Sequence, residues 1–437
     1  MLKITIPSNN KNERKYIIDI IFNEFLGLEY KLEIGSNNYE IILENSHKLI
    51  IQDSFFEHYS NDLEYLKLEN IPSKIEFTKN DFIVENDIPI IYGNSSLDIQ
   101  NSSLVCGIDI FASSFFMLTR WEEYVNKNRD NHNRFPAYES LAYKQNFLDR
   151  AVINEYIEML WNMLKYLGIK QQRKVKNYQL YLTHDVDELY MWKSWKQVLR
   201  VATGDILKRK NLGLALERIS EYFLIKRKRI NDPFDTFDWL MDKSEAIGVK
   251  SRFYFMSGGV TEYDNRYKIN EPKSLKLIKK IKKRGHIIGI HPSYNAYNDS
   301  EQFKKEKLIL EQIVEQKITE GREHYLRFEI PTTWQIWEDN RLEIDSTCGY
   351  ADKEGFRCGT GDEFSVFNIL TREKLRLKER ALIIMDCSLF DYQDLNYDDA
   401  ITEVNKLKNN NNLTMLWHNS YIKHNIFYKR LLEFKRT

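Results

Sequence analysis

A chain of 437 residues exceeds what one hydrophobic core usually organises, because domains run to about 100–200 residues and barrels to about 250. Its 42% hydrophobic and 29% charged residues are typical of a folded globular protein. No apolar run reaches the roughly 18 residues that a membrane span needs, so we expect neither a disordered chain nor transmembrane helices.

The first residues, MLKITIPSNN, lack the basic and apolar regions of a secretory signal and instead predict a first strand. The four cysteines form no CxxC pair and are too few for a disulfide scaffold in a chain of this length. A reducing compartment suits both features, so we expect a cytoplasmic protein.

Residues 1–170 predict a smaller α/β domain. Short β-rich runs alternate with Asn, Ser, Asp and Gly clusters at 15–22, 39–44, 47–53, 74–79 and 89–93. Helical periodicity follows at 108–125 and again at 152–168, where Gly168 ends the pattern. The polar stretch 168–177 is the expected linker.

Residues 175–437 predict a second domain in which β-type runs alternate with helical segments such as 236–248 and 300–316. This alternation favours parallel strands joined by helices, and the number of strands predicts a distorted seven-stranded (β/α) barrel. The expected strands are 178–184, 251–256, 286–290, 324–328, 342–346, 381–386 and 413–417.

Residues 189–230 predict a basic helical insertion into this domain. They hold eleven Lys or Arg residues against Asp205, Glu217 and Glu221, a local charge of +8 in a chain of zero net charge. A charge run is usually a solvated surface, but Trp192 and Trp195 add a second interpretation, peripheral contact with an anionic membrane. No recognised nucleic-acid module accompanies the charge, so we expect no nucleic-acid partner.

Polar residues stand at the ends of six of the seven predicted strands. In parallel β/α barrels the loops after the strands form one mouth, where catalytic side chains collect. The sequence therefore predicts a site at this mouth. The residues at these strand ends are Asp185, Asp187, His291, Arg327, Asp345, Asp386 and His418.

Asp185 and Asp187 are two positions apart, so on an extended backbone both carboxylates point to the same side. One can then hold a divalent metal while the other accepts a proton from water. Taken alone, the pair is more simply a helix cap, and His291 and His418 are more simply buried, hydrogen-bonded histidines. Their joint placement at one mouth favours the functional interpretation.

The order of motifs resembles the polysaccharide deacetylases of carbohydrate esterase family 4. The motif THDVD (183–187) is similar to that family's opening aspartate pair, which implies Asp185 as general base and Asp187 as metal ligand. GHIIGIHPSYNAY (285–297) is similar to its second motif, which implies His291 as a ligand. HYLRFEIP (324–331) and LTMLWHN (413–419) are similar to the later motifs, which implies that Arg327 orients the base and His418 is the acid.

The second motif departs from the family pattern at one position, because Asn295 stands where the family has its second histidine ligand. An amide is a weaker, neutral ligand for Zn²⁺ than imidazole. The candidates for the missing ligand are Asn295 itself and His324. His184 is more remote, because it should face away from Asp185.

The resemblance implies a Zn²⁺-dependent hydrolase that removes an acetyl group from an N-acetylated sugar, lipid- or nucleotide-linked, in surface glycan biosynthesis. Tyr294, Trp417 and Asp345 are the expected substrate contacts. The N-terminal half looks like the accessory domain of an uncharacterised bacterial branch of the family. The alternative is a catalytically silent carbohydrate-binding or assembly protein with a degenerate metal site.

Overall fold

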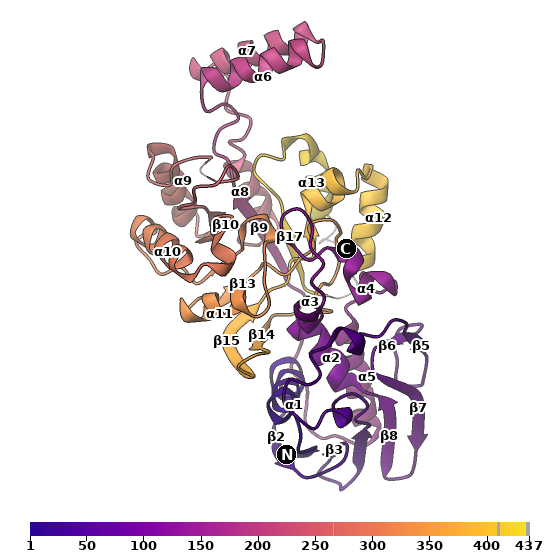
Figure 1. The fold of residues 1–437 in the computed structure, drawn as a ribbon. Coiled ribbons are helices and arrows are strands. Elements are labelled where there is room, and N and C mark those ends of the chain that lie inside the picture. Colours follow the sequence, from indigo (N-terminus) through magenta and orange to yellow (C-terminus); the bar gives the residue numbers. More distant parts are fainter. Residues whose placement is uncertain (265, 409–410, 434–437) are drawn as a thin grey trace. The chain divides into compact units, whose positions relative to one another are not determined.

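The computed structural model describes residues 1–264, 266–408 and 411–433. Contacts divide the chain into two compact units, and Figure 1 labels the helices and strands of both along the chain. Unit 1 comprises Met1–Leu180, Tyr294–Lys305 and Thr319–Met415, and unit 2 comprises Tyr181–Ser293, Glu306–Ile318 and Leu416–Thr437. This division follows contacts, and the boundary near residues 170–175 stays a prediction. Strands and helices in both units make the chain an α/β protein, as expected.

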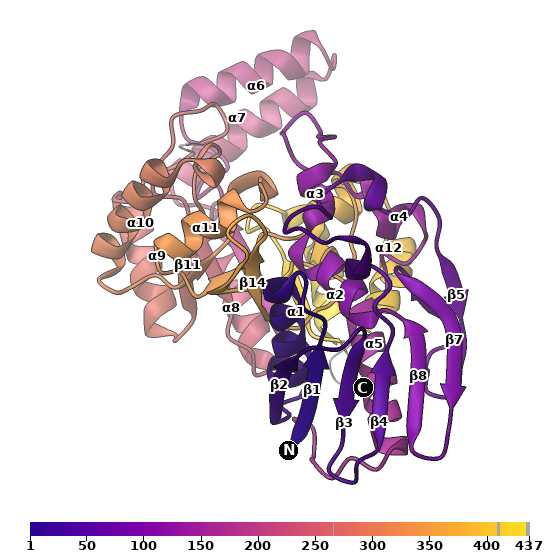
Figure 2. The same cartoon turned by 60° about the horizontal axis from the view of Figure 1, so that its bottom comes forward.

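Unit 1 contains a mixed six-stranded sheet in the order β2-β1-β3-β4-β8-β7. Figure 2 shows these strands side by side. The β1/β2 and β4/β8 pairs are parallel, and the other neighbours are antiparallel. The strands are β1 (Leu2–Ile6), β2 (Tyr30–Ile34), β3 (Tyr39–Ile42), β4 (Lys48–Ile51), β7 (Gly93–Ile99) and β8 (Ser103–Ile108). β5 (Glu76–Thr78) and β6 (Ile88–Ile90) form a separate antiparallel pair.

The strand predicted at 15–22 is wrong, because these residues continue helix α1 (Lys11–Ile18) into a π-helix at Asp19–Phe25. Its apolar residues are buried almost without exception, including Ile17, Ile18, Ile20 and Ile21. The helix does have an exposed polar face, which includes Lys11, Lys15 and Asn23, but only Lys15 of that face is exposed within residues 15–22, so a window of this length shows too little periodicity to distinguish a helix from a strand.

The two helices predicted in this region are confirmed. The first is divided into α2 (Ile110–Thr119) and α3 (Trp121–Val125). The second is α5 (Val152–Tyr166), and Gly168 follows it with a φ of 86°, the left-handed conformation that commonly ends a helix. The short α4 (Leu141–Lys144) lies between them.

Four strands in the later segments of unit 1 are hydrogen-bonded neighbours in the order β14-β15-β13-β12. β12, β13 and β15 run parallel, whereas β14 and β15 form an antiparallel hairpin that was not expected. The elements of this part are β12 (Glu320–Gly321), α11 (Thr332–Asp339), β13 (Ile344–Asp345), β14 (Phe364–Asn368), β15 (Glu373–Glu379), β16 (Ile384–Met385), α12 (Tyr397–Leu407) and β17 (Leu413–Leu416).

The strand predicted at 324–328 is also wrong. His324–Leu326 forms a 3₁₀ turn, in which Tyr325 and Leu326 have φ values of 60° and 55°. Two consecutive left-handed residues cannot continue an extended strand. The backbone strain at this turn is of order 1–3 kcal/mol for each residue.

Unit 2 is built on three parallel strands, β9 (Leu180–Val186), β10 (Arg252–Phe255) and β11 (Ile287–Ile290), with β10 in the middle. Helices α6 (Trp195–Leu207), α7 (Leu212–Lys226) and α8 (Phe237–Ala246) separate β9 from β10, and α9 (Pro272–Lys283) separates β10 from β11. The predicted alternation is confirmed for these three strands. The last helices are α10 (Ser300–Val314) and α13 (Asn425–Glu433). Among the described residues, no helix combines the length and apolarity needed to cross a membrane.

Asp109 provides a test of the packing in unit 1. It caps α2 and accepts hydrogen bonds from the backbone N–H groups of Ala112 and Ser54, both at 2.9 Å. Burial and the charge of Asp53 nevertheless raise its carboxyl pKa to about 7.

The pKa of Asp109 in the unfolded chain is about 3.9, so between pH 3.9 and 7 the folded protein binds one more proton at this group than the unfolded chain does. The free energy of unfolding should therefore fall as pH rises from 4 to 7, by on the order of 1 kcal/mol per pH unit from this group.

Asp109→Asn should remove that part of the pH dependence. Urea unfolding at pH 5, 6 and 7 measures it, with Asp98→Asn, an exposed carboxylate, as the control. An Asp109→Asn slope identical to that of the unmodified protein would contradict the account.

Candidate metal centre

The register of β9, β10 and β11 places three polar side chains on one face of unit 2. Asp185 pairs with Tyr254, which pairs in turn with Gly289. Paired residues of a parallel sheet share a face, and so do residues two apart along a strand. Asp187 and His291, two positions beyond Asp185 and Gly289, therefore lie on the face of Asp185. The ladder also continues to His291, whose N–H donates to the Phe255 carbonyl at 2.9 Å.

The Asp187 carboxylate lies between two imidazole rings. Its Oδ1 is 3.3 Å from His291 Nε2, and its Oδ2 is 3.7 Å from His418 Nε2. Asp185 Oδ2 lies 3.9 Å from the same nitrogen of His291. Asp185 and His291 are almost fully buried, whereas Asp187 and His418 are partly exposed. The four side chains thus form a group with a closed inner end and an open outer end.

The donor set and its spacing fit a zinc ion. Imidazole nitrogen and carboxylate oxygen bind Zn²⁺ at about 2.0–2.2 Å, so two ligands of a tetrahedral ion lie about 3.3–3.6 Å apart. The 3.3 Å between Asp187 and His291 falls within this spacing. Asp185 is farther from the His291 nitrogen, which suits a base beside the ion better than a ligand.

Asn419 fixes the loop that carries His418. Its side-chain amide donates to the carbonyls of Glu188 and Phe234, both at 2.8 Å, and its own carbonyl accepts from Thr236 Oγ1 at 2.8 Å. The amide thus ties the residue after His418 to the residue after Asp187. The only sign of this role in the sequence is that Asn419 is adjacent to His418.

His184 belongs to the core of unit 2. Its Nδ1 donates to the Trp417 carbonyl at 2.7 Å, and its Nε2 accepts from Ser251 Oγ at 3.1 Å. The ring is fully buried and both nitrogens have protein partners. His184 is therefore a structural histidine, as expected of a residue that faces away from Asp185.

Arg327 organises a polar turn in unit 1. Its guanidinium lies 4.0 and 4.1 Å from the ring centroids of Tyr294 and Tyr297. It donates to Asn295 Oδ1 at 3.0 Å and to the carbonyls of His132 and Tyr294 at 2.9 and 2.5 Å. The side-chain oxygen of Asn295, which would have to bind a metal, is thus engaged by a cation.

The other residues of unit 1 that were predicted to be metal ligands or substrate contacts are His324, Tyr294 and Asp345, and they differ in burial and in hydrogen-bond partners. His324 is buried beside the strained turn, and its ring centroid lies 4.7 Å from that of Tyr325. Tyr294 is half-buried, with its hydroxyl 3.0 Å from His132 Nδ1. Asp345 is fully buried, and burial raises its pKa to about 7 although Thr347 donates to it through N–H and Oγ1. Their roles as ligand or substrate contacts stay predictions.

Trp417, a predicted substrate contact in unit 2, is almost fully buried. Its ring packs against Tyr428 at a centroid distance of 4.9 Å, and Tyr421 and Phe427 lie at 5.9 and 6.5 Å. These neighbours make it part of an aromatic cluster under the His418 loop. A contact between Trp417 and substrate also stays a prediction.

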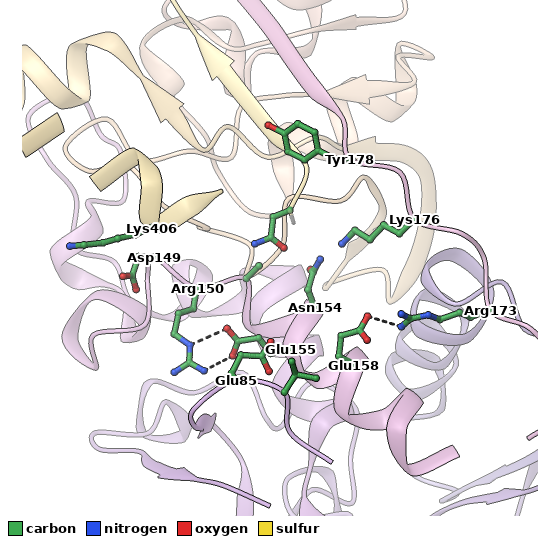
Figure 3. Close-up of a pocket in the computed structure, with 13 residues that line it drawn as sticks. Glu85, Asp149, Arg150, Asn154, Glu155, Glu158, Arg173, Lys176, Tyr178 and Lys406 are labelled. Carbon is green, nitrogen blue, oxygen red and sulfur yellow. Dashed lines mark hydrogen bonds and ion pairs between the residues drawn. The ribbon is translucent and has the colours of Figure 1, made fainter. Parts of the chain in front are cut away.

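A separate cavity of about 790 Å³ lies in unit 1 and is lined by acidic and basic side chains (Figure 3). Arg150 pairs with Glu155 at 2.6 Å, and Arg173 pairs with Glu158 at 2.6 Å. The lining holds four acidic and four basic side chains, so its formal net charge is zero.

A family model described as a family of unknown function, DUF7033, matches residues 2–168, less than half of the chain. No curated protein matches the chain. Solved structures show only distant likenesses, to members of the carbohydrate esterase 4 group. A protein of Mycobacterium smegmatis, provisionally assigned as a polysaccharide deacetylase, has 13% identity and a TM-score of 0.38, over 60% of this chain and 85% of its own.

Two further structures of this kind come from Bacillus. A pseudoenzyme of carbohydrate esterase family 4 from Bacillus anthracis has 10% identity and a TM-score of 0.32, over 60% of this chain and 63% of its own. A polysaccharide deacetylase from Bacillus cereus has 12% identity and a TM-score of 0.28, over 59% and 89%.

Asp187→Asn and His291→Ala test the proposed donor pair. Each should weaken Zn²⁺ affinity by at least about tenfold, since even residues that only support a metal ligand are worth about 10–100-fold in affinity. Competition with a chromogenic zinc chelator measures this, with His58→Ala, an exposed histidine of unit 1, as the control. Equal zinc affinity in all four proteins would contradict the assignment.

Proposed function

We propose that this protein is a metal-dependent hydrolase that removes the acetyl group from an N-acetylated sugar. The observation that carries the proposal is the group in unit 2, where the Asp187 carboxylate lies between His291 and His418 and a second, buried carboxylate, Asp185, stands beside the same imidazole. Two carboxylates and two imidazoles can divide the roles of metal ligand, general base and general acid.

The motif order in the sequence supports the same proposal. Asp185 lies near the end of β9, Asp187 directly follows β9 and His291 directly follows β11, which are the positions that the resemblance to polysaccharide deacetylases implies. Parallel strands with helical connections are also what a (β/α) barrel requires. A distorted seven-stranded barrel is therefore the finer fold that we propose.

Asp187 and His291 would hold the ion, and zinc is the ion that their chemistry favours. A bound Zn²⁺ supplies Lewis acidity, which lowers the pKa of water and polarises the acetyl carbonyl. Asp185 accepts the proton of the attacking water. His418, on the open side of the group, gives a proton to the nitrogen of the departing amine, because imidazole can hold and release a proton near neutral pH.

His324 is the third ligand in this proposal. Asn295 occupies the position of the family's second histidine, but its Oδ1 accepts a hydrogen bond from Arg327. A neutral amide oxygen that is already engaged by a cation is a poor zinc ligand. His324 offers an imidazole, is buried, and lies in a strained turn of the kind that often accompanies function. Arg327 then acts as a positioning residue for the segment that follows His291.

The substrate in this proposal is a lipid- or nucleotide-linked N-acetylated sugar of surface glycan assembly. The alternative is a catalytically silent carbohydrate-binding or assembly protein. The observation that favours it is Asn295, because a metal site that lacks its third ligand would bind the ion weakly. Purified protein with less than about a tenth of an equivalent of zinc, and no uptake of Zn²⁺ or Co²⁺ at micromolar concentration, would support the alternative.

Asp185→Asn tests the general base. It should slow acetate release from N-acetylglucosamine oligosaccharides, or from a chromogenic acetate ester, by about a hundredfold or more while zinc content stays unchanged. Asp242→Asn, an exposed carboxylate of unit 2, should keep the full rate. Equal acetate release by the Asp185→Asn variant and the unmodified enzyme would rule out this role.

His324→Ala and Asn295→Ala distinguish the two candidates for the third ligand. His324→Ala should lower zinc affinity by at least about tenfold, whereas Asn295→Ala should leave it within about twofold. Competition with a chromogenic zinc chelator measures both. The assignment of His324 fails if its variant binds zinc as tightly as the unmodified protein.

A further inference from the structure

Helices α6 and α7 form an antiparallel hairpin in unit 2. Figure 1 shows them side by side, standing away from the strands of their own unit. Ser194 caps α6 and Asn211 caps α7, and residues 208–211 connect the two helices. Val198 near the start of α6 belongs to the same apolar cluster as Tyr222 near the end of α7, which gives the antiparallel direction.

The hairpin has an inner face of its own. Trp192, Val198 and Tyr222 are buried together, and their partly buried neighbours are Met191, Val201, Ile219 and Ile225. Asp205 is fully buried and pairs with Arg218 of α7 at 2.6 Å. This inner face therefore supplies the apolar packing between the two helices of the hairpin.

Each helix carries a second apolar stripe that faces outward. The members stand at positions i, i+4 and i+11, which cover only about 40° of the helix circumference. All six are 44–60% exposed. They are Trp195, Leu199 and Ile206 in α6 and Leu212, Leu216 and Phe223 in α7.

The two stripes lie on the same side of the hairpin. In each helix the stripe is offset from the inner face by roughly a quarter turn in the same rotational sense, from Val198 towards Leu199 and from Ala215 towards Leu216. The helices face each other and run in opposite directions, so equal offsets bring both stripes to one side. The six residues form a single surface, which we call the apolar platform.

Cations border the apolar platform at both ends. The turn between the helices carries Lys208, Arg209 and Lys210, and residues 226–229 carry four more after Phe223. Lys196 and Arg200 are exposed alongside the stripe of α6. With its eleven cations and three acids, the 189–230 segment has a net charge of +8.

We propose that the apolar platform docks on the surface of an anionic membrane, with both helices lying parallel to it. Aromatic and aliphatic side chains on one face with Lys and Arg around it are the pattern of interfacial helices, whose apolar face enters the acyl boundary while the cations meet lipid phosphates. Two copies facing each other would bring two charges of +8 together. Nucleic acid would contact the cations and leave the apolar side chains in water.

Flotation of the full chain with lipid vesicles tests the docking. The protein should float with vesicles of 70% phosphatidylcholine and 30% phosphatidylglycerol, and binding should weaken at least tenfold on pure phosphatidylcholine or in 0.5 M NaCl. This outcome does not depend on the proposed hydrolase activity.

Two double variants separate the contributions of the platform. Leu199→Gln with Leu216→Gln should weaken binding to the anionic vesicles at least tenfold, and so should Lys208→Glu with Lys210→Glu. Leu308→Gln, which alters an exposed leucine of α10 in the same unit, should bind like the unmodified protein. Because all these side chains are exposed, circular dichroism should show unchanged folding.

Three outcomes would overturn the proposal. The first is absence of the unmodified protein from the floating fraction, and the second is binding that neither double variant weakens. The third is self-association, measured by light scattering, that the leucine variant abolishes while vesicle binding is absent, since the platform would then be an interface between copies of this chain.

Discussion

The candidate centre depends on the register of a parallel sheet, in which alternate residues of paired strands share one face. The pairing of β9, β10 and β11 therefore places Asp185, Asp187 and His291 on the same face. Asn419 holds the loop of His418 against the end of β9. Buried carboxylates are costly unless opposite charge compensates them. Protonated imidazole can meet this requirement, and so can a divalent cation. The 3.3 Å between Asp187 and His291 suits the shared ion.

Much of this centre could be predicted from sequence because the signals are local. A two-residue spacing at a strand end determines which way Asp185 and Asp187 point, and a Gly-flanked apolar strand ends at His291. The hydrogen bonds that position these residues could not be read in the same way. Asn419 reaches carbonyls of Glu188 and Phe234, 231 and 185 residues away in the chain, and sequence pattern carries no information on such pairings.

The two wrong strands have separate physical causes. Residues 15–22 contain a single exposed side chain, Lys15, so this short window holds too little of the helix's polar face for periodicity to distinguish a helix from a strand. Residues 324–328 have the composition of a strand, but the backbones of Tyr325 and Leu326 are left-handed. A sequence usually signals this conformation through Gly, Asn or Asp, and neither position has one of these residues. The α6–α7 hairpin shows the opposite case. Its charge is visible in the sequence. That its two apolar stripes lie on one side of the hairpin follows only from the antiparallel arrangement of the helices, which the sequence does not show.

Asp187 and His291 should share one metal ion. Anomalous diffraction at the zinc absorption edge, from crystals grown with equimolar Zn²⁺, tests it most directly. One strong peak should lie about 2.0–2.2 Å from a carboxylate oxygen of Asp187 and from His291 Nε2. The absence of a peak at this position, in crystals that bind zinc elsewhere, would contradict the account.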